Sequence, residues 1–273
     1  MPAHKDALGL VSGRTRVFGI VGDPIEQVRS PEMFTAEFRR RGRDAVLVPI
    51  HVRPEDFDAC LPELLKVANL DGLIFTIPYK ARALHLANVV GPNAQIVGAI
   101  NALARMGDGR WKADIFDGLG CVEAFRRQGI GFVDRRVMLL GAGGAGSAIA
   151  VAIAFEHPRS LQIYDPDAAR GETLAAKVKR VDPKIAVAVD VPKVTGIDVL
   201  LNASPIGMLE DARLPLEVER LPRELVIFDA IVTPERTPLL VLAETCGCAT
   251  IGGREMMRGQ SDAMVDFFGY PET

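Results

Sequence analysis

Short apolar runs alternate with amphipathic segments along most of this chain. Apolar runs of about four to eight residues are typical of buried strands, whereas apolar positions that recur at about every third or fourth residue are typical of helices. Their alternation predicts mostly parallel strands joined by helices, which is an α/β fold. We expect strands at 17–21, 45–52, 73–77, 98–105 and 111–115 in the first half, and at 137–140, 161–164, 185–189, 199–201, 225–228 and 249–251 in the second.

The predicted helices lie between these strands and after the last one. Ser30 and Pro31 mark a helix start, because serine is a preferred N-cap and proline suits the first helical position. Gly91-Pro-Asn is expected to be a turn between elements. The final amphipathic segment carries methionines on its apolar face, which favours core packing. We expect helices at 30–41, 54–69, 81–90, 119–128, 147–155, 168–181, 237–245 and 254–268.

A glycine-rich turn joins a predicted strand to a predicted helix in the second half. After the apolar run 137–140, residues 141–146 read G-x-G-x-x-G. In such a turn the first glycine permits the tight bend, the second lets the backbone approach a pyrophosphate, and the third lets helix and strand pack closely. A carboxylate at the end of the next strand would accept hydrogen bonds from the ribose of adenosine. We therefore predict a dinucleotide site at Gly141, Gly143, Gly144, Ala145, Gly146 and Asp165, and a glycine-rich turn without a ligand is the alternative.

The first half has no glycine turn of this kind, so the sequence divides into two lobes. We expect residues 1–117 to form a substrate-binding and catalytic domain, and residues 118–252 to form a Rossmann-type domain that binds NAD or NADP. Cofactor and substrate would then meet in a cleft between the two lobes.

Composition narrows the classes of function. The 273 residues carry a formal net charge of −3, whereas binding to a nucleic-acid backbone usually needs a basic patch. No apolar run reaches membrane length, and the first residues lack the basic and apolar blocks of a secretory signal peptide. The four cysteines have no zinc-site spacing and are expected to be reduced thiols. We therefore expect a cytoplasmic monomer or homodimer with a small-molecule substrate, and no metal, membrane or nucleic-acid partner.

Two charged residues stand where hydride transfer would need a proton carrier. Lys80 follows the predicted strand 73–77, at the end where open α/β sheets bind ligands. A partly buried amine gives up its proton more readily, because desolvation disfavours the ammonium form. A surface lysine at a helix start is the alternative. Asp117 could orient Lys80, bind a substrate hydroxyl or N-cap the next helix, and Asn101 could bind a ligand or satisfy neighbouring backbone groups.

Several motifs, in order along the chain, resemble those of the shikimate/quinate dehydrogenase family. The resemblance covers about residues 16–270, and the ordered set is far more specific than any one motif. The motifs are G-D-P-I at Gly22 with S-P at Ser30, T-I-P-Y-K from Thr76 to Lys80, V-G-A-I-N ending at Asn101, D-G-L-G at Asp117, N-A-S-P-I-G-M from Asn202 to Met208, Asp229 with T-P-L at Thr237, and then Gly253 and Gln260.

The resemblance implies a two-lobed oxidoreductase. Such an enzyme transfers hydride reversibly between a nicotinamide and a ring hydroxyl or ketone of a shikimate- or quinate-like acid, as in the reduction of 3-dehydroshikimate. It implies Lys80 and Asp117 as the catalytic pair, and a last helix, 253–273, that returns to the first lobe. It also implies substrate contacts from Ser30, Thr76, Asn101 and Gln260, and cofactor contacts from Ser204, Met208 and Gly253.

Three positions depart from the family pattern. The family has serine, asparagine and tyrosine where this chain has Val28, Ile74 and Val232. The serine and the tyrosine usually hydrogen-bond the substrate carboxylate, and the asparagine a substrate hydroxyl. We therefore hypothesise poor turnover of shikimate and a different substrate, such as a less polar or amino-substituted cyclic alcohol. A non-catalytic nicotinamide-binding regulator is a third alternative, which the presence of both Lys80 and Asp117 disfavours.

The residues after the second strand of the Rossmann domain bear on the choice of cofactor. NADP-preferring members of the family carry N-R-T there, with the arginine pairing the 2′-phosphate. This chain has Asp165-Pro-Asp167, whose carboxylates would repel a phosphate and suit a free ribose diol. Arg170 could compensate in part. We therefore predict NAD as the favoured cofactor, with NADP as the alternative.

Overall fold

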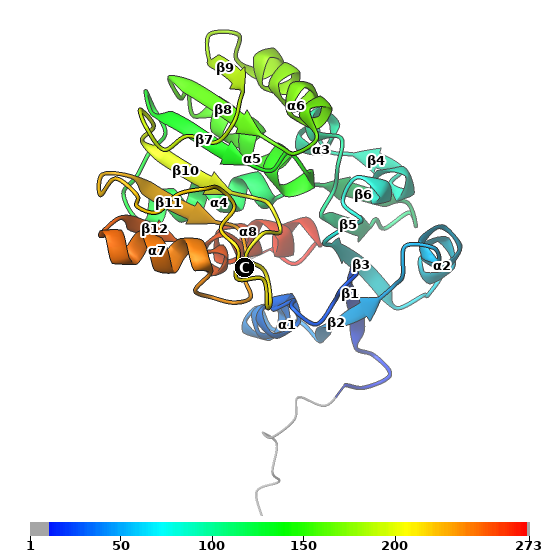
Figure 1. Cartoon of the computed structure of the whole chain (residues 1–273). Coiled ribbons are helices and arrows are strands. Elements are labelled where there is room, and N and C mark those ends of the chain that lie inside the picture. The colour runs from blue at the N-terminus through cyan, green and yellow to red at the C-terminus, as the bar shows by residue number, and fades with distance from the viewer. Residues whose placement is uncertain (1–10, 272–273) are drawn as a thin grey trace, which may run out of the picture.

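The chain folds into two six-stranded sheets, one from each half of the sequence, which confirms the predicted two-lobed α/β fold (Figure 1). The computed structural model describes residues 11–271. The first sheet contains β1 (Arg16–Gly22), β2 (Ala45–His51), β3 (Leu70–Phe75), β4 (Val89–Val90), β5 (Ala102–Arg105) and β6 (Trp111–Asp114). The second contains β7 (Arg136–Leu140), β8 (Ser160–Tyr164), β9 (Ala186–Val189), β10 (Val199–Asn202), β11 (Val226–Asp229) and β12 (Ala249–Ile251).

The first sheet has the order β2-β1-β3-β5-β6-β4 and mixes parallel with antiparallel pairs. β1 is parallel to β2 and β3, whereas β5 is antiparallel to β3 and β6. Phe18 and Ile20 of β1 pack with α1, and Val21 packs on the opposite face with α2, so both faces of the sheet are buried. The helices that follow these strands are α1 (Ser30–Arg40), α2 (Phe57–Leu64), the 3₁₀ helix η1 (Arg82–Leu86) and α3 (Pro92–Val97).

The segment after residue 81 differs from the helix predicted at 81–90 and the turn predicted at Gly91. It forms η1, then β4, and then α3, which begins at Pro92 where we expected the turn. The Asp114 carboxylate accepts a hydrogen bond from the backbone N–H of Ala94 at 2.8 Å and so caps the first turn of α3. Because this cap comes from a residue 20 positions away, the local sequence does not reveal the helix.

Two other elements are shorter than predicted. The helix expected at 54–69 spans only Phe57–Leu64, with Pro62 inside its last turn. The strand expected from residue 98 begins at Ala102. Gly98, with a φ of +74°, takes the left-handed conformation that ends α3, and the strand can start only after it.

The second sheet has the order β12-β11-β10-β7-β8-β9, with parallel neighbours. Val137 and Leu139 of β7 pack with α4 (Asp117–Arg127), α5 (Gly144–Phe155) and α6 (Ala168–Val181). Met138 and Leu140 pack on the other face with α7 (Pro238–Cys246). The strand order reverses between β7 and β10. The glycine turn after β7 lies at this switch point, where open α/β sheets bind ligands.

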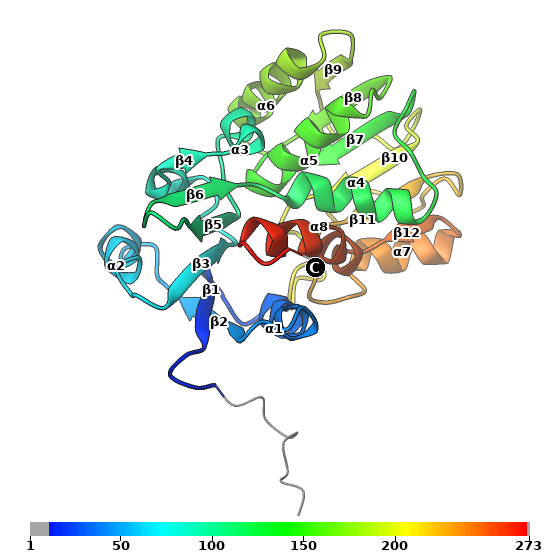
Figure 2. The same cartoon turned by 180° about the vertical axis from the view of Figure 1, so that it is seen from behind.

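The last helix, α8 (Gly253–Phe267), runs beside α4 toward the first sheet, with α1 below it (Figure 2). A Cβ atom at Gly259 would lie 2.5 Å from the backbone oxygen of Gly120, so α8 and α4 touch backbone to backbone. Arg41, whose side chain is 3% exposed, pairs with Asp262 at 3.1 Å and with Asp266, and these ion pairs join α8 to the end of α1. Within residues 11–271 no helix combines the length and apolar character needed to cross a membrane.

Candidate active site

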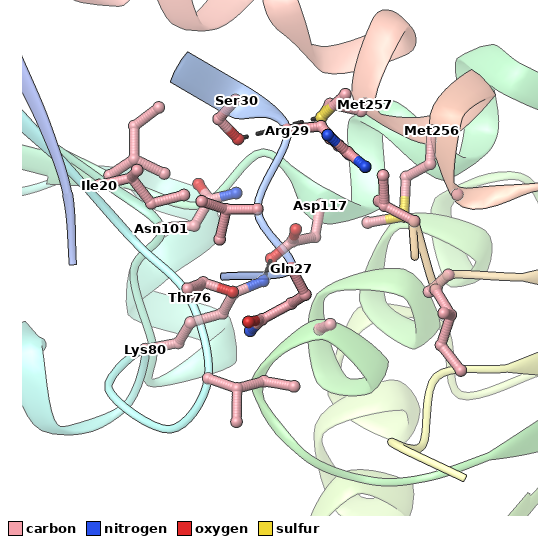
Figure 3. A pocket seen from close by; sticks show the side chains of 18 of the residues that line it. Ile20, Gln27, Arg29, Ser30, Thr76, Lys80, Asn101, Asp117, Met256 and Met257 are labelled. Carbon is pink, nitrogen blue, oxygen red and sulfur yellow. Dashed lines mark hydrogen bonds and ion pairs between the residues drawn. The ribbon is translucent and has the colours of Figure 1, made fainter. Parts of the chain in front are cut away.

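A cavity of about 170 Å³ lies where the two lobes and α8 meet (Figure 3). Its walls include loops that follow β1 and β3 in the first lobe and loops that follow β10 and β11 in the second. Of the residues predicted from the sequence, the cavity brings together Ser30, Thr76, Lys80, Asn101, Asp117, Ala145, Ser204, Met208, Gly253 and Gln260. The other predicted residues, Gly141, Gly143, Gly144, Gly146 and Asp165, are outside its lining.

Lys80 and Asp117 form an ion pair in the cavity wall. Nζ of Lys80 lies 2.5 Å from Oδ2 of Asp117, and the two side chains are only 14% and 5% exposed. Lys80 comes from the turn after β3, and Asp117 is the first residue of α4. The Asp117 side chain does not cap this helix, whose N-cap is Phe116. Of the roles left open for Asp117, the geometry therefore favours holding the amine of Lys80 in position.

The stem of Lys80 lies against the glycine turn of the other lobe. A Cβ atom at Gly144 would stand 3.0 Å from the Cβ of Lys80, so only glycine leaves this contact free of strain. Gly144 is the first residue of α5, and no side chain caps the first N–H groups of that helix. The stem of Lys80 thus lies next to a helix N-terminus, the kind of position that can bind an anion.

Asn101 satisfies a neighbouring backbone group, which is one of the two roles predicted for it, and it also bonds a side chain of α8. Its Oδ1 accepts a hydrogen bond from the backbone N–H of Phe116 at 2.9 Å, which fixes the residue before Asp117. Its Nδ2 donates to Oε1 of Gln260 at 3.1 Å, which links the first sheet to α8. The amide pair is therefore a rigid part of the cavity wall that also joins two elements.

The three departures from the family pattern, Val28, Ile74 and Val232, all line this cavity. Further apolar side chains surround them, and the lining also includes the polar side chains of Gln27, Arg29 and Thr233. The Ser30 hydroxyl has a sulfur partner, Sδ of Met257 at 3.9 Å, which is a weak acceptor. The larger apolar lining residues are Ile20, Val28, Phe34, Ile74, Phe75, Ile77, Met208, Ile231, Val232, Met256, Met257 and Met264.

Asp165 is tied to the glycine turn by its own carboxylate. Oδ2 accepts a hydrogen bond from the backbone N–H of Ala142 at 2.8 Å, and Oδ1 accepts one from Asp167 at 2.9 Å. Asp167 caps α6 by accepting from Ala169 at 3.1 Å and pairs with Arg170 at 3.3 Å. The sequence did not show these bonds. These bonds hold the carboxylates of Asp165 and Asp167 at the end of β8. Arg170, whose positive charge could have offset them, is already paired with Asp167.

The buried carboxylate of Asp229 holds two loops of the cavity together. Desolvation raises its pKa to about 6. It accepts hydrogen bonds from the Thr237 hydroxyl at 2.7 Å, from Nδ2 of Asn202 at 3.1 Å and from the backbone N–H of Ile231 at 3.1 Å. Asn202 in turn accepts from the Ser204 hydroxyl at 2.7 Å. The sequence motifs include Asp229 without assigning it this role. An acidic residue at the end of an apolar strand is the feature of the sequence that could have indicated it.

Known proteins match the chain over almost its whole length. The family model for the "Shikimate dehydrogenase substrate binding domain" matches residues 20–103. A shikimate dehydrogenase (NADP(+)) of Geobacter metallireducens is 32% identical over 264 residues, which cover 93% of this chain and 91% of the relative. The chain belongs to the shikimate dehydrogenase family. The family membership that the resemblance from the sequence implied is therefore confirmed.

Solved structures of shikimate dehydrogenase relatives show the same two-lobed fold with different cofactors and names. A quinate dehydrogenase from Corynebacterium glutamicum in complex with NAD has a TM-score of 0.82 at 27% identity, covering 94% of this chain and 95% of that one. A 5-ketofructose reductase of Gluconobacter sp. strain CHM43 has a TM-score of 0.79 at 26% identity, covering 94% of each chain. As a family member, this chain is an NAD(P)-dependent dehydrogenase that acts on a CH–OH group, which sets aside the non-catalytic alternative.

The glycine turn fits the dinucleotide that this family uses. A Cβ atom at Gly143 would meet no atom within 4 Å, so the backbone there faces open space. A Cβ atom at Gly146 would lie 1.9 Å from the backbone oxygen of Gly141, so helix and strand touch at that point. Gly141 has a φ of +98°, which favours glycine. The three glycines thus have the surroundings that the fingerprint requires for a pyrophosphate at the start of α5.

Proposed function

We propose that this protein oxidises a ring hydroxyl of a cyclic alcohol that is less polar than shikimate, and reduces the corresponding ketone. The proposal rests on one observation, the Lys80–Asp117 pair in the wall of a cavity that also receives the N-terminus of α5. Oxidation of an alcohol by a nicotinamide needs a proton carrier and a hydride acceptor in one cavity.

The reaction assigns one task to each charged residue. When bound, a nicotinamide supplies the hydride acceptor for the carbon that bears the hydroxyl. In the oxidation direction Nζ of Lys80 takes up the hydroxyl proton, and in the reverse direction it returns that proton to the carbonyl oxygen. Asp117 holds the amine at 2.5 Å and stabilises the positive charge that forms on it.

The remaining cavity residues divide between substrate and cofactor. Polar side chains of the first lobe and α8 surround the space beside Lys80, so we assign them to the substrate. Residues at the start of α5, in the loop after β10 and at the start of α8 lie on the glycine-turn side, so we assign them to the cofactor. The substrate group is Ser30, Thr76, Asn101 and Gln260, and the cofactor group is Ala145, Ser204, Met208 and Gly253 with Gly141, Gly143, Gly144, Gly146 and Asp165 of the turn region.

The lining of the cavity argues against shikimate as the preferred substrate. Val28 and Val232 stand where the family has hydroxyls that bind a carboxylate, and Ile74 stands where it has an amide. A hydrogen bond to a charged group is worth about 1.5–3 kcal/mol, so two lost contacts lower kcat/KM on the order of a hundredfold or more. The 5-ketofructose reductase supports a changed substrate, since it has this fold and is named for a ketone other than 3-dehydroshikimate.

The end of β8 supports NAD over NADP. Asp165 and Asp167 bring two carboxylates to this point, and Arg170 is already paired with Asp167. A 2′-phosphate near them would meet like charge, whereas a ribose diol would meet hydrogen-bond acceptors. The curated Geobacter relative is named for NADP and the Corynebacterium quinate dehydrogenase was solved with NAD, so the family uses both.

We also propose where the functional domains divide. The substrate-binding and catalytic domain comprises residues 1–117 with the C-terminal helix 253–273, and the nicotinamide domain comprises 118–252. The chain changes from the first sheet to the second between β6 and β7, with α4 between them, which supports the first boundary; the start of α8 at Gly253 supports the second. Residues 1–10 and 272–273 lie outside the described part of the chain.

Steady-state rates test the proposal directly. Initial rates are measured for the purified protein with NAD⁺ and NADP⁺ on shikimate, quinate, cyclohexanol and the cyclohexanediols. We expect kcat/KM for shikimate to lie at least about a hundredfold below that of the best cyclic alcohol. A kcat/KM for shikimate in the ordinary enzyme range of about 10⁴–10⁸ M⁻¹ s⁻¹, with no better alcohol, would refute the altered pocket.

A further inference from the structure

The side chain of Gln27 presents a buried oxygen that lacks a hydrogen-bond donor. Gln27 lies in the loop between β1 and α1, is 8% exposed and lines the cavity. Its Nε2 donates to the backbone oxygen of Pro24 at 2.7 Å. Its Oε1 has no partner among residues 11–271. Figure 3 shows the amide end of Gln27 on the side of the cavity where Thr76 and Lys80 lie.

The neighbouring backbone fixes which end of the amide is free. Exchanging the oxygen and nitrogen of Gln27 would set two carbonyl oxygens against each other at the 2.7 Å contact with Pro24. The nitrogen therefore faces Pro24, and the oxygen is left for another donor. A buried carbonyl oxygen without a donor is destabilising, and native proteins retain few of them. In a cavity wall, such an acceptor is satisfied by whatever fills the cavity.

The loop that carries Gln27 is held at both sides of the amide. The Thr233 hydroxyl, from the loop after β11, donates to the backbone oxygen of Gln27 at 2.9 Å. On the other side, the backbone N–H of Asp23 donates to the oxygen of Ile77 at 2.9 Å. Turning the side chain out of the cavity would break its bond to Pro24. Gln27 is thus a preorganised acceptor, which binds a donor without a further ordering cost.

We propose that Oε1 of Gln27 accepts a hydrogen bond from the substrate, and so selects a cyclic alcohol that carries a second donor group, a hydroxyl or an amino group. This inference rests on the proposed function. Gln27 and Lys80 line the same cavity, and the amide end of Gln27 lies on the Lys80 side, so we expect a six-membered ring bound at Lys80 to reach Gln27 as well (Figure 3). The inference deepens the proposed function by naming the group that the less polar substrate still needs.

The same atom disfavours an acid in that position. A carboxylate has no proton to donate at neutral pH, and its oxygens would meet the partial negative charge of Oε1. Val28 and Val232 remove hydroxyls that would bind a carboxylate, while Gln27 adds an acceptor that a carboxylate cannot use. The two changes act in the same direction, toward a neutral or cationic donor on the substrate.

The test compares Gln27→Met with Gln95→Met. Methionine has a similar length to glutamine but neither donates nor accepts a strong hydrogen bond. Gln95 is the matched control, because its Nε2 also donates to a backbone oxygen, that of Val90 at 2.8 Å, while its side chain is exposed and away from the cavity lining. For wild type and both variants, kcat and KM are measured on cyclohexanol, the three cyclohexanediols and the aminocyclohexanols, together with the Kd for NAD⁺ and the Tm.

We expect the wild type to prefer a diol or an aminocyclohexanol over cyclohexanol. Comparison of the diols with the aminocyclohexanols shows whether the donor is a hydroxyl or an amino group. Gln27→Met should lower kcat/KM for the preferred compound about tenfold, while cyclohexanol, the Kd for NAD⁺ and every value of Gln95→Met stay within about twofold. A wild type that prefers cyclohexanol, or a Gln27→Met loss that is equal for all alcohols, would overturn the inference and leave the proposed function standing. Absence of turnover with every ring alcohol would instead overturn the proposed function.

Discussion

Lys80 and Gly144 meet across the two lobes: a Cβ atom added at Gly144 would lie 3.0 Å from Cβ and 3.3 Å from Cδ of Lys80. The contact sets the stem of Lys80 against Gly144, the first residue of α5, the helix that follows the glycine turn. Gly144→Ala should therefore displace the Lys80 side chain by a few tenths of an ångström and lower kcat by about twofold to tenfold, since misplacement of about 1 Å can cost a hundredfold.

Gly143→Ala is the matched variant for this contact, because a Cβ atom there would meet no protein atom within 4 Å. It should leave the position of Lys80 intact and instead raise the Kd for NAD⁺, as the new methyl group occupies the space that a pyrophosphate needs. Titration of NAD⁺ and steady-state kinetics on both variants separate the two effects. Equal changes in kcat and Kd for the two variants would contradict the assignment.

Loss of the Lys80 amine should abolish most of the activity without loss of cofactor binding. Lys80→Met should lower kcat by about 10²- to 10⁴-fold, the usual contribution of a positioned proton donor. Lys66→Met is the control, because Lys66 also pairs with a carboxylate, Glu63 at 2.6 Å, but is 70% exposed. Rates and NAD⁺ binding are measured for both. Unchanged turnover in Lys80→Met would remove Lys80 from the reaction.

Substitution of Asp167 should move the cofactor preference toward NADP. Asp167→Thr keeps a side-chain N-cap for α6 but removes one carboxylate and releases Arg170 from its 3.3 Å pair. A charge change of this kind near a phosphate is worth about 1 kcal/mol in solvent, so the ratio of kcat/KM for NADP⁺ to that for NAD⁺ should rise by roughly fivefold to tenfold. A wild type that already prefers NADP⁺ would show that the two carboxylates do not govern the choice.

Restoring the family residues should restore activity on shikimate. Val28→Ser with Ile74→Asn returns one carboxylate contact and one hydroxyl contact to the cavity wall. We expect kcat/KM for shikimate to rise about tenfold or more, and that for cyclohexanol to fall, because the wall becomes more polar. A double variant that remains as poor on shikimate as the wild type, with the same Tm, would mean that other residues exclude this acid.

The buried carboxylate of Asp229 should make stability depend on pH. Its pKa is raised to about 6 from a usual value near 3.8, mainly by desolvation. Between about pH 4 and pH 6 the folded chain therefore holds a proton that the unfolded chain has lost. The contribution of this group to the free energy of unfolding is fully present below pH 4 and is lost as the pH rises through 6. The loss amounts to about 3 kcal/mol, because the pKa shift is roughly two units.

Comparison of the wild type with Asp229→Asn measures this pH-dependent contribution to stability. The free energy of unfolding is determined between pH 4 and pH 7 for wild type and variant. The wild type should lose stability relative to Asp229→Asn as the pH rises, whatever the mean effect of the substitution on its hydrogen bonds. A constant difference across this range would show that Asp229 stays ionised in the folded protein.

The second lobe was predictable because its units are local. The strand before Gly141, the glycine turn and the helix after it follow one another along the chain, and parallel strands that are buried on both faces read as continuous apolar runs. The position of Lys80 in the cavity wall was predictable for a related reason, since the loop that follows a parallel strand lies at the edge of the sheet where ligands bind. The distance from Lys80 to Asp117 was an expectation from the family resemblance rather than from any local pattern.

What the sequence did not reveal depends on contacts between distant residues. α3 is capped by Asp114, which the local pattern at Gly91-Pro-Asn does not show. Within the described part of the chain, Oε1 of Gln27 has no donor because the amide is oriented with its nitrogen toward the backbone oxygen of Pro24. The residues next to Gln27 in sequence do not predict this orientation. Tertiary hydrogen bonds of this kind become visible only when the elements are placed in space.

The close crossing of α4 and α8 at Gly120 and Gly259 determines how the molecule could open. Two backbones in direct contact leave no room for a side chain between the helices, so we expect this crossing to serve as the pivot of any rotation between the two lobes. Asp117 and Gln260 sit within a turn of that pivot, whereas the Thr233–Gln27 bond closes the opposite rim. On opening, the rim would swing widest and admit the substrate, and the proton-transfer pair, close to the axis, would hardly move.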